Sequence, residues 1–266
     1  MVAQPDVAGL NIVIVGGTTG LGLSAAKALA AAGARLVIFS RSDANVRAAL
    51  GELGNAARGF AGDATDPAAA ERAVALAVSE FGRLDALYHV AGGSGRSRGD
   101  GPLHEISDEG WRHTIELNLT GVFLSNRAAL RQFLKQGGGG NILNMSSVLA
   151  WSPSPDHFAS HAYAAAKAAV IGLSKAAAAR YAKDNIRVNV IAPGLVETPM
   201  SRRAATDDKI MRFIKTKQPL DGGRIGNPDD LDDAVLFLLS RGSKFITGQV
   251  VAVDGGWTVS EGRGEC

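Results

Sequence analysis

Short apolar runs rich in Val, Ile and Leu alternate along the chain with longer segments in which apolar residues recur at helical spacing. Runs of this kind are typical of strands buried on both faces of a parallel sheet. Gly, Pro, Ser or Asp follows them, as expected where a strand gives way to a turn. The predicted strands lie within residues 10–15, 34–41, 57–62, 84–93, 141–147, 185–194 and 248–257.

The segments between these runs predict helices. One helix has an N-cap residue, Asp66, followed by Pro67 at its first position, and it runs to about Phe81. Six strand–helix steps and a closing strand predict a single doubly wound Rossmann domain of the α/β class, with about seven parallel strands and helices on both faces. The domain is predicted to span residues 1–266. Further helices are expected between the first strand and Ala32, from about Asp108 to Gln136, from His161 to Ala182, and within 227–240.

A glycine-rich turn, GGTTGLG from Gly16 to Gly22, joins the first strand to the first helix. Glycines let the backbone approach a pyrophosphate, and a helix N-terminus offers free N–H groups and a positive dipole end. The spacing of Gly16, Gly20 and Gly22 differs from the common Gly-x-Gly-x-x-Gly fingerprint. The turn therefore predicts a phosphate cradle, with an ordinary tight turn as the alternative.

The second predicted strand ends at Ser40 and Arg41, where a dinucleotide fold that binds NAD usually has an acidic residue. The next acid is Asp43. A guanidinium can hold a phosphate with two hydrogen bonds, so this strand end predicts a preference for NADP(H) over NAD(H). A solvated strand end is the alternative.

Tyr163 and Lys167 lie four residues apart in the long Ala-rich helix, and therefore project from one helix face. A free phenol has a pKa of roughly 10, and a fixed positive charge nearby favours its ionised form. Bringing that pKa near 7 would take about 4 kcal/mol, which requires a partly dry site. Without such a site, the pair would be a Tyr and a Lys on a solvated helix face.

Three other features bear on a possible site. Asn118 lies on an apolar stripe of the helix predicted from Asp108, together with Trp111, Ile115, Leu119, Val122 and Phe123, where a packing role is the simplest interpretation. Arg96 and Arg98, in the polar loop 94–102, could face an anionic substrate, with ordinary surface charges as the alternative. The polar, basic segment 197–226 is predicted to be a mobile lid that shapes the substrate pocket, together with the loop around SPSPDHF.

Composition narrows the function further. The 266 residues have a formal net charge of +2, with both signs mixed along the chain, so no footprint for nucleic acid is expected. No apolar run approaches the length that spans a bilayer, and the first ten residues lack the order of a signal peptide. The only cysteine, Cys266, excludes an intramolecular disulfide and is expected in a frayed tail. We expect a cytoplasmic protein with no metal site.

Taken together, these residues resemble the short-chain dehydrogenase/reductase family over nearly the whole chain, and in particular its 3-oxoacyl-carrier-protein reductase-like members. The glycine turn looks like the family's Gly-x-x-x-Gly-x-Gly motif, and Tyr163-Ala-Ala-Ala-Lys167 like its Tyr-x-x-x-Lys motif. Asn118 and Ser147 occupy the places of the family's helix Asn and its Ser after a strand. Pro193-Gly194 with Thr198, and VDGG near the C-terminus, fit as well.

The resemblance implies an NADP(H)-dependent oxidoreductase that transfers a hydride between the nicotinamide and a carbonyl or secondary alcohol, and that assembles as a homotetramer or dimer. It implies that Tyr163 exchanges a proton with the substrate oxygen and that Ser147 hydrogen-bonds that oxygen. Lys167 would lower the Tyr pKa and hold the nicotinamide ribose, and Asn118 would position a water. The implied cofactor residues are Gly16, Thr18, Gly20, Leu21, Gly22, Ser40, Arg41, Asp63, Ala64, Ala91, Gly92, Tyr163, Lys167, Pro193, Gly194, Val196 and Thr198.

The chain departs from the family pattern at three places. Val15 replaces the Thr that usually opens the glycine turn, and His89-Val90 replaces a pair of Asn. The loop between Ser147 and Tyr163 is longer than is typical, which leaves open whether Ser146 or Ser147 faces the substrate and predicts a reshaped pocket wall. Two other functions remain open on this fold: a nucleotide-binding sensor without turnover, and a lyase or epimerase. The intact Asn, Ser, Tyr and Lys set favours an oxidoreductase over the sensor.

Overall fold

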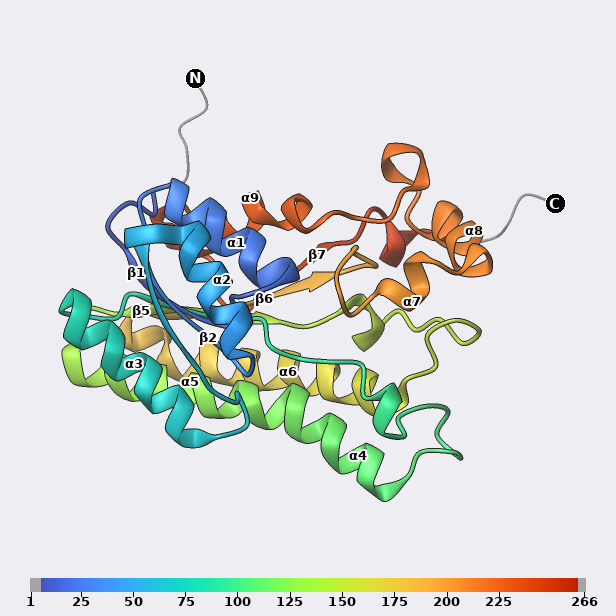
Figure 1. Cartoon of the computed structure of the whole chain (residues 1–266), viewed down its shortest axis with the longest axis horizontal. Coiled ribbons are helices and arrows are strands. Elements are labelled where there is room, and N and C mark those ends of the chain that lie inside the picture. The colour runs from blue at the N-terminus through green and yellow to red at the C-terminus, as the bar shows by residue number, and fades with distance from the viewer. Residues whose placement is uncertain (1–5, 263–266) are drawn as a thin grey trace.

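Seven parallel strands form one sheet in the order β3-β2-β1-β4-β5-β6-β7 in the computed structural model, which describes residues 6–262 (Figure 1). The chain steps outward from β1 to β3, then returns so that β4 lies beside β1, which creates a crevice at the carboxyl ends of these two strands. The predicted fold class is confirmed. The strands are β1 (Asn11–Val15), β2 (Arg35–Ser40), β3 (Ala57–Ala61), β4 (Ala86–His89), β5 (Gly140–Met145), β6 (Ile186–Pro193) and β7 (Val250–Val253).

The sheet separates two hydrophobic cores because successive strand residues point to opposite faces. In β1, Ile12 and Ile14 contribute to one core, while Val13 and Val15 contribute to the other. All five β1 residues are buried. The continuous apolar run at residues 10–15 therefore reflects a central strand that is covered on both sides.

The helices cover both faces of this sheet. Helices α1, α2 and α9 pack on one face, and α3, α5 and α6 pack on the other (Figure 1). The side chain of Ser42 accepts a hydrogen bond from the backbone of Asn45 and so caps α2. The helices are α1 (Gly20–Ala31), α2 (Asp43–Leu53), α3 (Pro67–Phe81), α4 (Asp108–Ile115), α5 (Gly121–Gln136), α6 (His161–Tyr181), α7 (Arg202–Ala205), α8 (Asp208–Lys217) and α9 (Asp232–Leu239).

The single helix predicted from Asp108 to Gln136 is interrupted by a π-helical turn, Glu116–Thr120, between α4 and α5. Such a turn inserts an extra residue and rotates the side chains that follow relative to those before it. The predicted apolar stripe is consequently wrong at Trp111 and Phe123, which are each 42% exposed.

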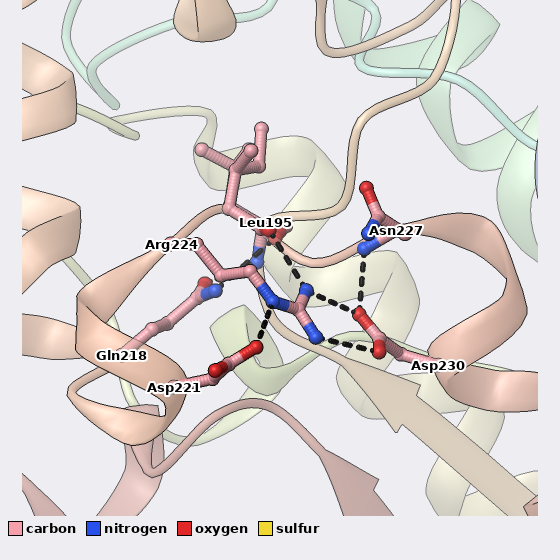
Figure 2. Close-up of polar contacts among 7 residues, drawn as sticks. Leu195, Gln218, Asp221, Arg224, Asn227 and Asp230 are labelled. Atoms are coloured by element: carbon pink, nitrogen blue, oxygen red, sulfur yellow. Dashed lines mark hydrogen bonds and ion pairs between the residues drawn. The ribbon is translucent and has the colours of Figure 1, made fainter.

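The segment 197–226 leaves the sheet after β6 and returns to its own starting point. The backbone N–H of Glu197 donates to the carbonyl of Gly226, and the N–H of Gly226 donates to the carbonyl of Leu195. Figure 2 shows the side chains beside this junction: Gln218 bonds both backbone groups of Leu195, and Arg224 forms hydrogen bonds with Asp221 and Asp230. The two ends of the segment are therefore tied together.

The segment also has a small core of its own. Ile210 and Ile214 of α8 and Ala204 of α7 pack with Val148 and Trp257. The predicted mobility of this segment stays a prediction, but its contacts place it against the sheet's carboxyl edge. No helix within residues 6–262 is long and apolar enough to cross a membrane. The first residues of the chain and Cys266, both considered in the sequence, lie outside the described residues.

Candidate active site

A cavity of about 490 Å³ lies at the carboxyl ends of the strands, a volume typical of small-molecule sites. It extends between the turns that follow β1, β2, β3 and β4 and the ends of β5 and β6. Every cofactor residue expected from the sequence lines it except Gly22, and so do Ser147, Tyr163 and Lys167. Residues from six separate strand ends thus line one cavity.

The backbone of the glycine turn is packed too closely for a side chain at Gly16 or Gly22. Gly16 has a φ of +86°, and a Cβ there would lie 2.8 Å from the backbone nitrogen of Ala91. Gly22 does not line the cavity, but a Cβ on it would lie 2.1 Å from the carbonyl oxygen of Gly16. Thr19, the N-cap residue of α1, offers no side-chain hydrogen bond to the helix N-terminus. The turn therefore presents backbone N–H groups that suit an anionic pyrophosphate.

Two hydroxyls and a guanidinium lie at the end of the cavity near β2. Thr18 Oγ1 and Ser40 Oγ are 2.7 Å apart, and Arg41 follows as an exposed residue. Asp63 lines the cavity next to them, and its Oδ1 accepts hydrogen bonds from the backbone and hydroxyl of Thr65.

Ser147, Tyr163 and Lys167 meet at the other end of the cavity. The Lys167 ammonium lies 5.5 Å from the centroid of the Tyr163 ring and donates to the carbonyl oxygen of Met145 at 3.0 Å. Ser146 Oγ donates to the carbonyl oxygen of Lys167 at 2.8 Å, whereas Ser147 interacts with the phenol of Tyr163. This arrangement places Ser147, rather than Ser146, beside the tyrosine.

Burial shifts the pKa values of both Tyr163 and Lys167. Burial raises the pKa of Tyr163 to about 12, and the hydrogen bond with Ser147 offsets only part of that effect. Burial also lowers the pKa of Lys167 to about 8. The role of Lys167 in lowering the pKa of the phenol stays a prediction, and burial, the largest cause of the shift at Tyr163, acts in the opposite direction. At neutral pH the phenol is protonated and able to donate.

Asn118 is buried in the π-helical turn and does not line the cavity. Its amide nitrogen donates to the carbonyls of Gly93 and Thr114 at 2.8 and 2.9 Å, and its Oδ1 accepts from the N–H of Gly93 at 3.0 Å. Asn118 thus fastens the loop after β4 to the helix that covers it. Its part in a water relay stays a prediction.

Gly92 passes between two of these side chains. A Cβ at this position would lie 2.7 Å from Asn118 Oδ1 and 3.2 Å from Lys167 Nζ. The glycine is therefore needed here for space.

The departures at β1 and β4 are accommodated by other hydrogen bonds. The carbonyl oxygen of Val15 accepts from the N–H groups of Val90 and Ala91, both at 2.9 Å, which braces the turn without a Thr hydroxyl. The buried His89 ring contacts Ser125 Oγ at 2.7 Å and the Ala91 carbonyl at 3.2 Å. Burial, followed by the charge of Lys167, lowers the pKa of His89 to about 3, so the ring is neutral and holds Ala91 through one N–H.

The longer loop does form part of the cavity wall. Phe158 packs edge-on against Trp257, with ring centroids 5.7 Å apart, and both residues line the cavity. Trp257 Nε1 also donates to the carbonyl oxygen of Ser152 at 3.0 Å. The aromatic character of this wall was not predicted, because it depends on a contact between residues distant in the chain.

Two further kinds of residue were missed or undervalued. Asp100 is a buried carboxylate that contacts the start of α6, and a lone Asp in a Gly-rich loop gave no signal of this. Arg96 and Arg203 both line the cavity, whereas the sequence favoured ordinary surface charge for Arg96 and a solvated basic face for the segment that contains Arg203. Among the described residues, no three His, Cys, Asp or Glu side chains are grouped to hold a metal ion.

Comparisons with known proteins identify the family of this chain. The family model described as enoyl-(acyl carrier protein) reductase matches residues 15–258. Cis-4-hydroxycyclohexanecarboxylate dehydrogenase of Sinomonas cyclohexanicum is 36% identical over 248 residues, covering 92% of this chain and 95% of that protein.

Two solved structures, each 31% identical, superimpose over most of their length. The structure of a short-chain type dehydrogenase/reductase from Mycobacterium ulcerans has a TM-score of 0.87 over 97% of this chain and 92% of its own. The structure of the 3-ketoacyl-(acyl-carrier-protein) reductase of Brucella melitensis, complexed with NADH, has a TM-score of 0.84 over 96% of this chain and 100% of its own. The protein therefore belongs to the short-chain dehydrogenase/reductase family, and it is an oxidoreductase that acts on CH–OH groups with a nicotinamide cofactor.

Proposed function

We propose that this protein is an NADP(H)-dependent oxidoreductase that interconverts a cyclic secondary alcohol and its ketone. The observation that carries the proposal is the meeting of Ser147, Tyr163 and Lys167 in the same cavity as the glycine turn. The cyclic substrate is suggested by the relative that acts on a hydroxycyclohexanecarboxylate, and by the apolar wall that Phe158 and Trp257 provide.

The residues present fit a dinucleotide. The turn from Gly16 to Gly22 and the N-terminus of α1 would hold the pyrophosphate through backbone N–H groups, because no side chain caps that end of the helix. Lys167 would hold the nicotinamide ribose, with Pro193, Gly194 and Thr198 on the nicotinamide side. When bound, the nicotinamide donates or accepts the hydride.

The end of β2 supports NADP(H) over NAD(H). The hydroxyls of Thr18 and Ser40 and the guanidinium of Arg41 offer donors to a 2′-phosphate. The nearest following carboxylate, Asp43, is paired with Arg47 at 2.9 Å and so does not neutralise Arg41. We therefore assign the phosphate-binding role to Arg41.

In the reductive direction, the protonated phenol of Tyr163 donates its proton to the carbonyl oxygen, and Ser147 hydrogen-bonds the same oxygen. Burial favours this protonation state at neutral pH. Lys167 supplies a positive charge next to the phenol that would stabilise the phenolate left after transfer. A positioned acid of this kind typically contributes about 10²- to 10⁴-fold to the rate.

The test is Tyr163→Phe, assayed with NADPH and a panel of cyclic ketones. We expect NADPH binding within about twofold of wild type and a loss of reduction of about 100-fold or more. Tyr181→Phe, at the other end of α6, is the control and should retain turnover. Near-normal reduction by the Tyr163→Phe protein would remove this residue from the mechanism. Stoichiometric consumption of NADPH separates the oxidoreductase from a sensor and from a lyase or epimerase.

We also propose that the protein forms a homotetramer or dimer. Trp111, Phe123 and Leu134 of α4 and α5 are each more than 40% exposed. Large apolar side chains gathered on two successive helices are typical of an interface between protein copies. Light scattering coupled to size-exclusion chromatography measures the mass, and a monomer at micromolar concentration would contradict the assembly.

A further inference from the structure

Two arginines from distant parts of the chain line the same cavity as Tyr163. Arg96 belongs to the loop after β4, and Arg203 belongs to α7 within the segment 197–226. Both are exposed as well as cavity-lining, so they lie where the cavity meets solvent. The fold therefore places two fixed positive charges at the entrance to the candidate active site.

The two guanidiniums influence one another. The pKa of Arg96 is lowered first by burial and then by the charge of Arg203. Arg96 is also held in place, because its Nη2 donates to the carbonyl oxygen of His157 at 3.3 Å. Like charges held near each other are unfavourable unless an anion or solvent compensates them.

The carboxylates near this pair are already engaged. Asp100, which attracts Arg96, uses both oxygens to accept the N–H groups of Ala162 and Tyr163. Asp207, which feels the charge of Arg203, accepts the N–H groups at the start of α8. Within residues 6–262, neither Arg96 nor Arg203 has a carboxylate oxygen within 4.0 Å.

Arg224 shows the contrast within the same segment. Its guanidinium forms hydrogen bonds with Asp221 and Asp230, and it does not line the cavity (Figure 2). Arg224 is thus paired with protein carboxylates, whereas Arg96 and Arg203 have no such partner among residues 6–262.

We propose that Arg96 and Arg203 form a subsite that binds an anionic oxygen group, of which carboxylate is the simplest, on the substrate. The inference rests on the proposed oxidoreductase function and narrows its substrate class. The wall of the same cavity also includes the apolar residues Leu149, Phe158, Met200 and Trp257. The substrate is accordingly an alcohol or ketone on an apolar body with an anionic end group. Guanidinium groups suit this task because they bind carboxylate oxygens with two parallel hydrogen bonds.

The experiment compares a keto acid with its uncharged ester, using 4-oxocyclohexanecarboxylate and its methyl ester with NADPH. Wild type is expected to prefer the acid in kcat/KM. Arg96→Gln and Arg203→Gln should each lower the acid-to-ester ratio about 10- to 100-fold, mainly through KM for the acid. NADPH dissociation constants should stay within about twofold.

Matched controls are available beside each arginine. Arg98 and Arg202 are exposed and lie two and one residues away, but neither lines the cavity. Arg98→Gln and Arg202→Gln should therefore leave the ratio within about twofold of wild type. An equal fall of the acid-to-ester ratio in these controls would indicate general electrostatic attraction and would overturn the subsite. A wild-type protein with no preference for the acid would overturn it as well. Weakened NADPH binding in the Arg96 or Arg203 variants would reassign the pair to the cofactor.

A binding measurement separates this inference from the proposed function. Calorimetry on the NADP⁺-loaded protein compares cyclohexanecarboxylate with cyclohexanecarboxamide, neither of which can react. If wild type reduces neither ketone but binds the carboxylate, and both arginine variants lose that binding, the subsite is supported and the proposed NADP(H)-dependent interconversion of a cyclic alcohol and ketone fails. If the ketones are reduced and the carboxylate binds no better than the amide, the subsite is overturned and the oxidoreductase proposal survives.

Discussion

Asp100 holds the backbone of Tyr163. Its Oδ2 accepts the N–H of Tyr163 at 3.0 Å, and its Oδ1 accepts the N–H of Ala162 at the same distance. The carboxylate is only 6% exposed and lies at the positive end of α6, where a negative charge is stabilising. The neighbouring carbonyl of Gly101 accepts the N–H of His161. The loop after β4 therefore caps the helix that presents the tyrosine.

Replacing Asp100 with Ala is expected to destabilise the protein by about 1–3 kcal/mol, because two buried N–H groups lose their acceptor. It should also lower kcat more than it changes KM, since the first turn of α6 carries Tyr163. Asp100→Asn keeps one acceptor oxygen, so its stability and kcat should lie between those of wild type and Asp100→Ala. Urea unfolding and steady-state kinetics measure these effects. A destabilised Asp100→Ala protein with wild-type kcat would show that the cap serves stability alone.

Gly92→Ala should reduce turnover by about tenfold or more, because the new methyl group would meet Asn118 Oδ1 and Lys167 Nζ. Gly51→Ala is the control: it lies in α2 with nothing within 4 Å of its added Cβ. That change should leave activity intact and add about 0.5–1 kcal/mol of stability. Unchanged turnover in Gly92→Ala would show that this crowding is relieved without affecting the site.

Lys167→Met tests the cost of a buried ammonium. Below about pH 8 both the native and the unfolded protein hold the lysine proton, so the native state bears the full cost of burying the charge. Between about pH 8 and 10.5 the native lysine loses its proton while the unfolded one keeps it, so wild-type stability rises relative to the variant.

We therefore expect Lys167→Met to be inactive yet more stable than wild type at pH 7, with that advantage shrinking by up to about 3 kcal/mol towards pH 10. Urea unfolding at several pH values measures the difference. Lys175→Met, on the exposed side of the same helix, is the control for the loss of a lysine from this helix. A difference between Lys167→Met and wild type that is independent of pH would contradict the lowered pKa.

Arg41→Ala tests the cofactor preference. Loss of a guanidinium that binds a 2′-phosphate should weaken NADPH about 10- to 100-fold and change NADH by less than about twofold. Fluorescence titration with both cofactors measures the two constants. Arg241→Ala, an exposed arginine outside the cavity, should change neither. Equal losses for NADPH and NADH would refute the assignment to NADP(H).

Much of the cofactor half of the site follows from local sequence. The glycine turn, the end of β2 and the Tyr163–Lys167 spacing each lie within a short stretch, and each directly follows or forms a regular element. Because parallel strands share one carboxyl edge, predicting the strands already predicts that these turns converge. The cavity lining agrees with that expectation at Ser40, Ala91 and Gly194.

The sequence by itself determined the α/β fold, the family and most of the cofactor-side residues that line the cavity, since these depend on hydrophobic periodicity and short motifs. Only the tertiary structure decided how those side chains behave. The raised pKa of Tyr163 depends on burial by several elements, and the cap from Asp100 joins residues 63 positions apart. The Arg96–Arg203 pair likewise depends on a loop and a helix meeting in space, so no local pattern could reveal it.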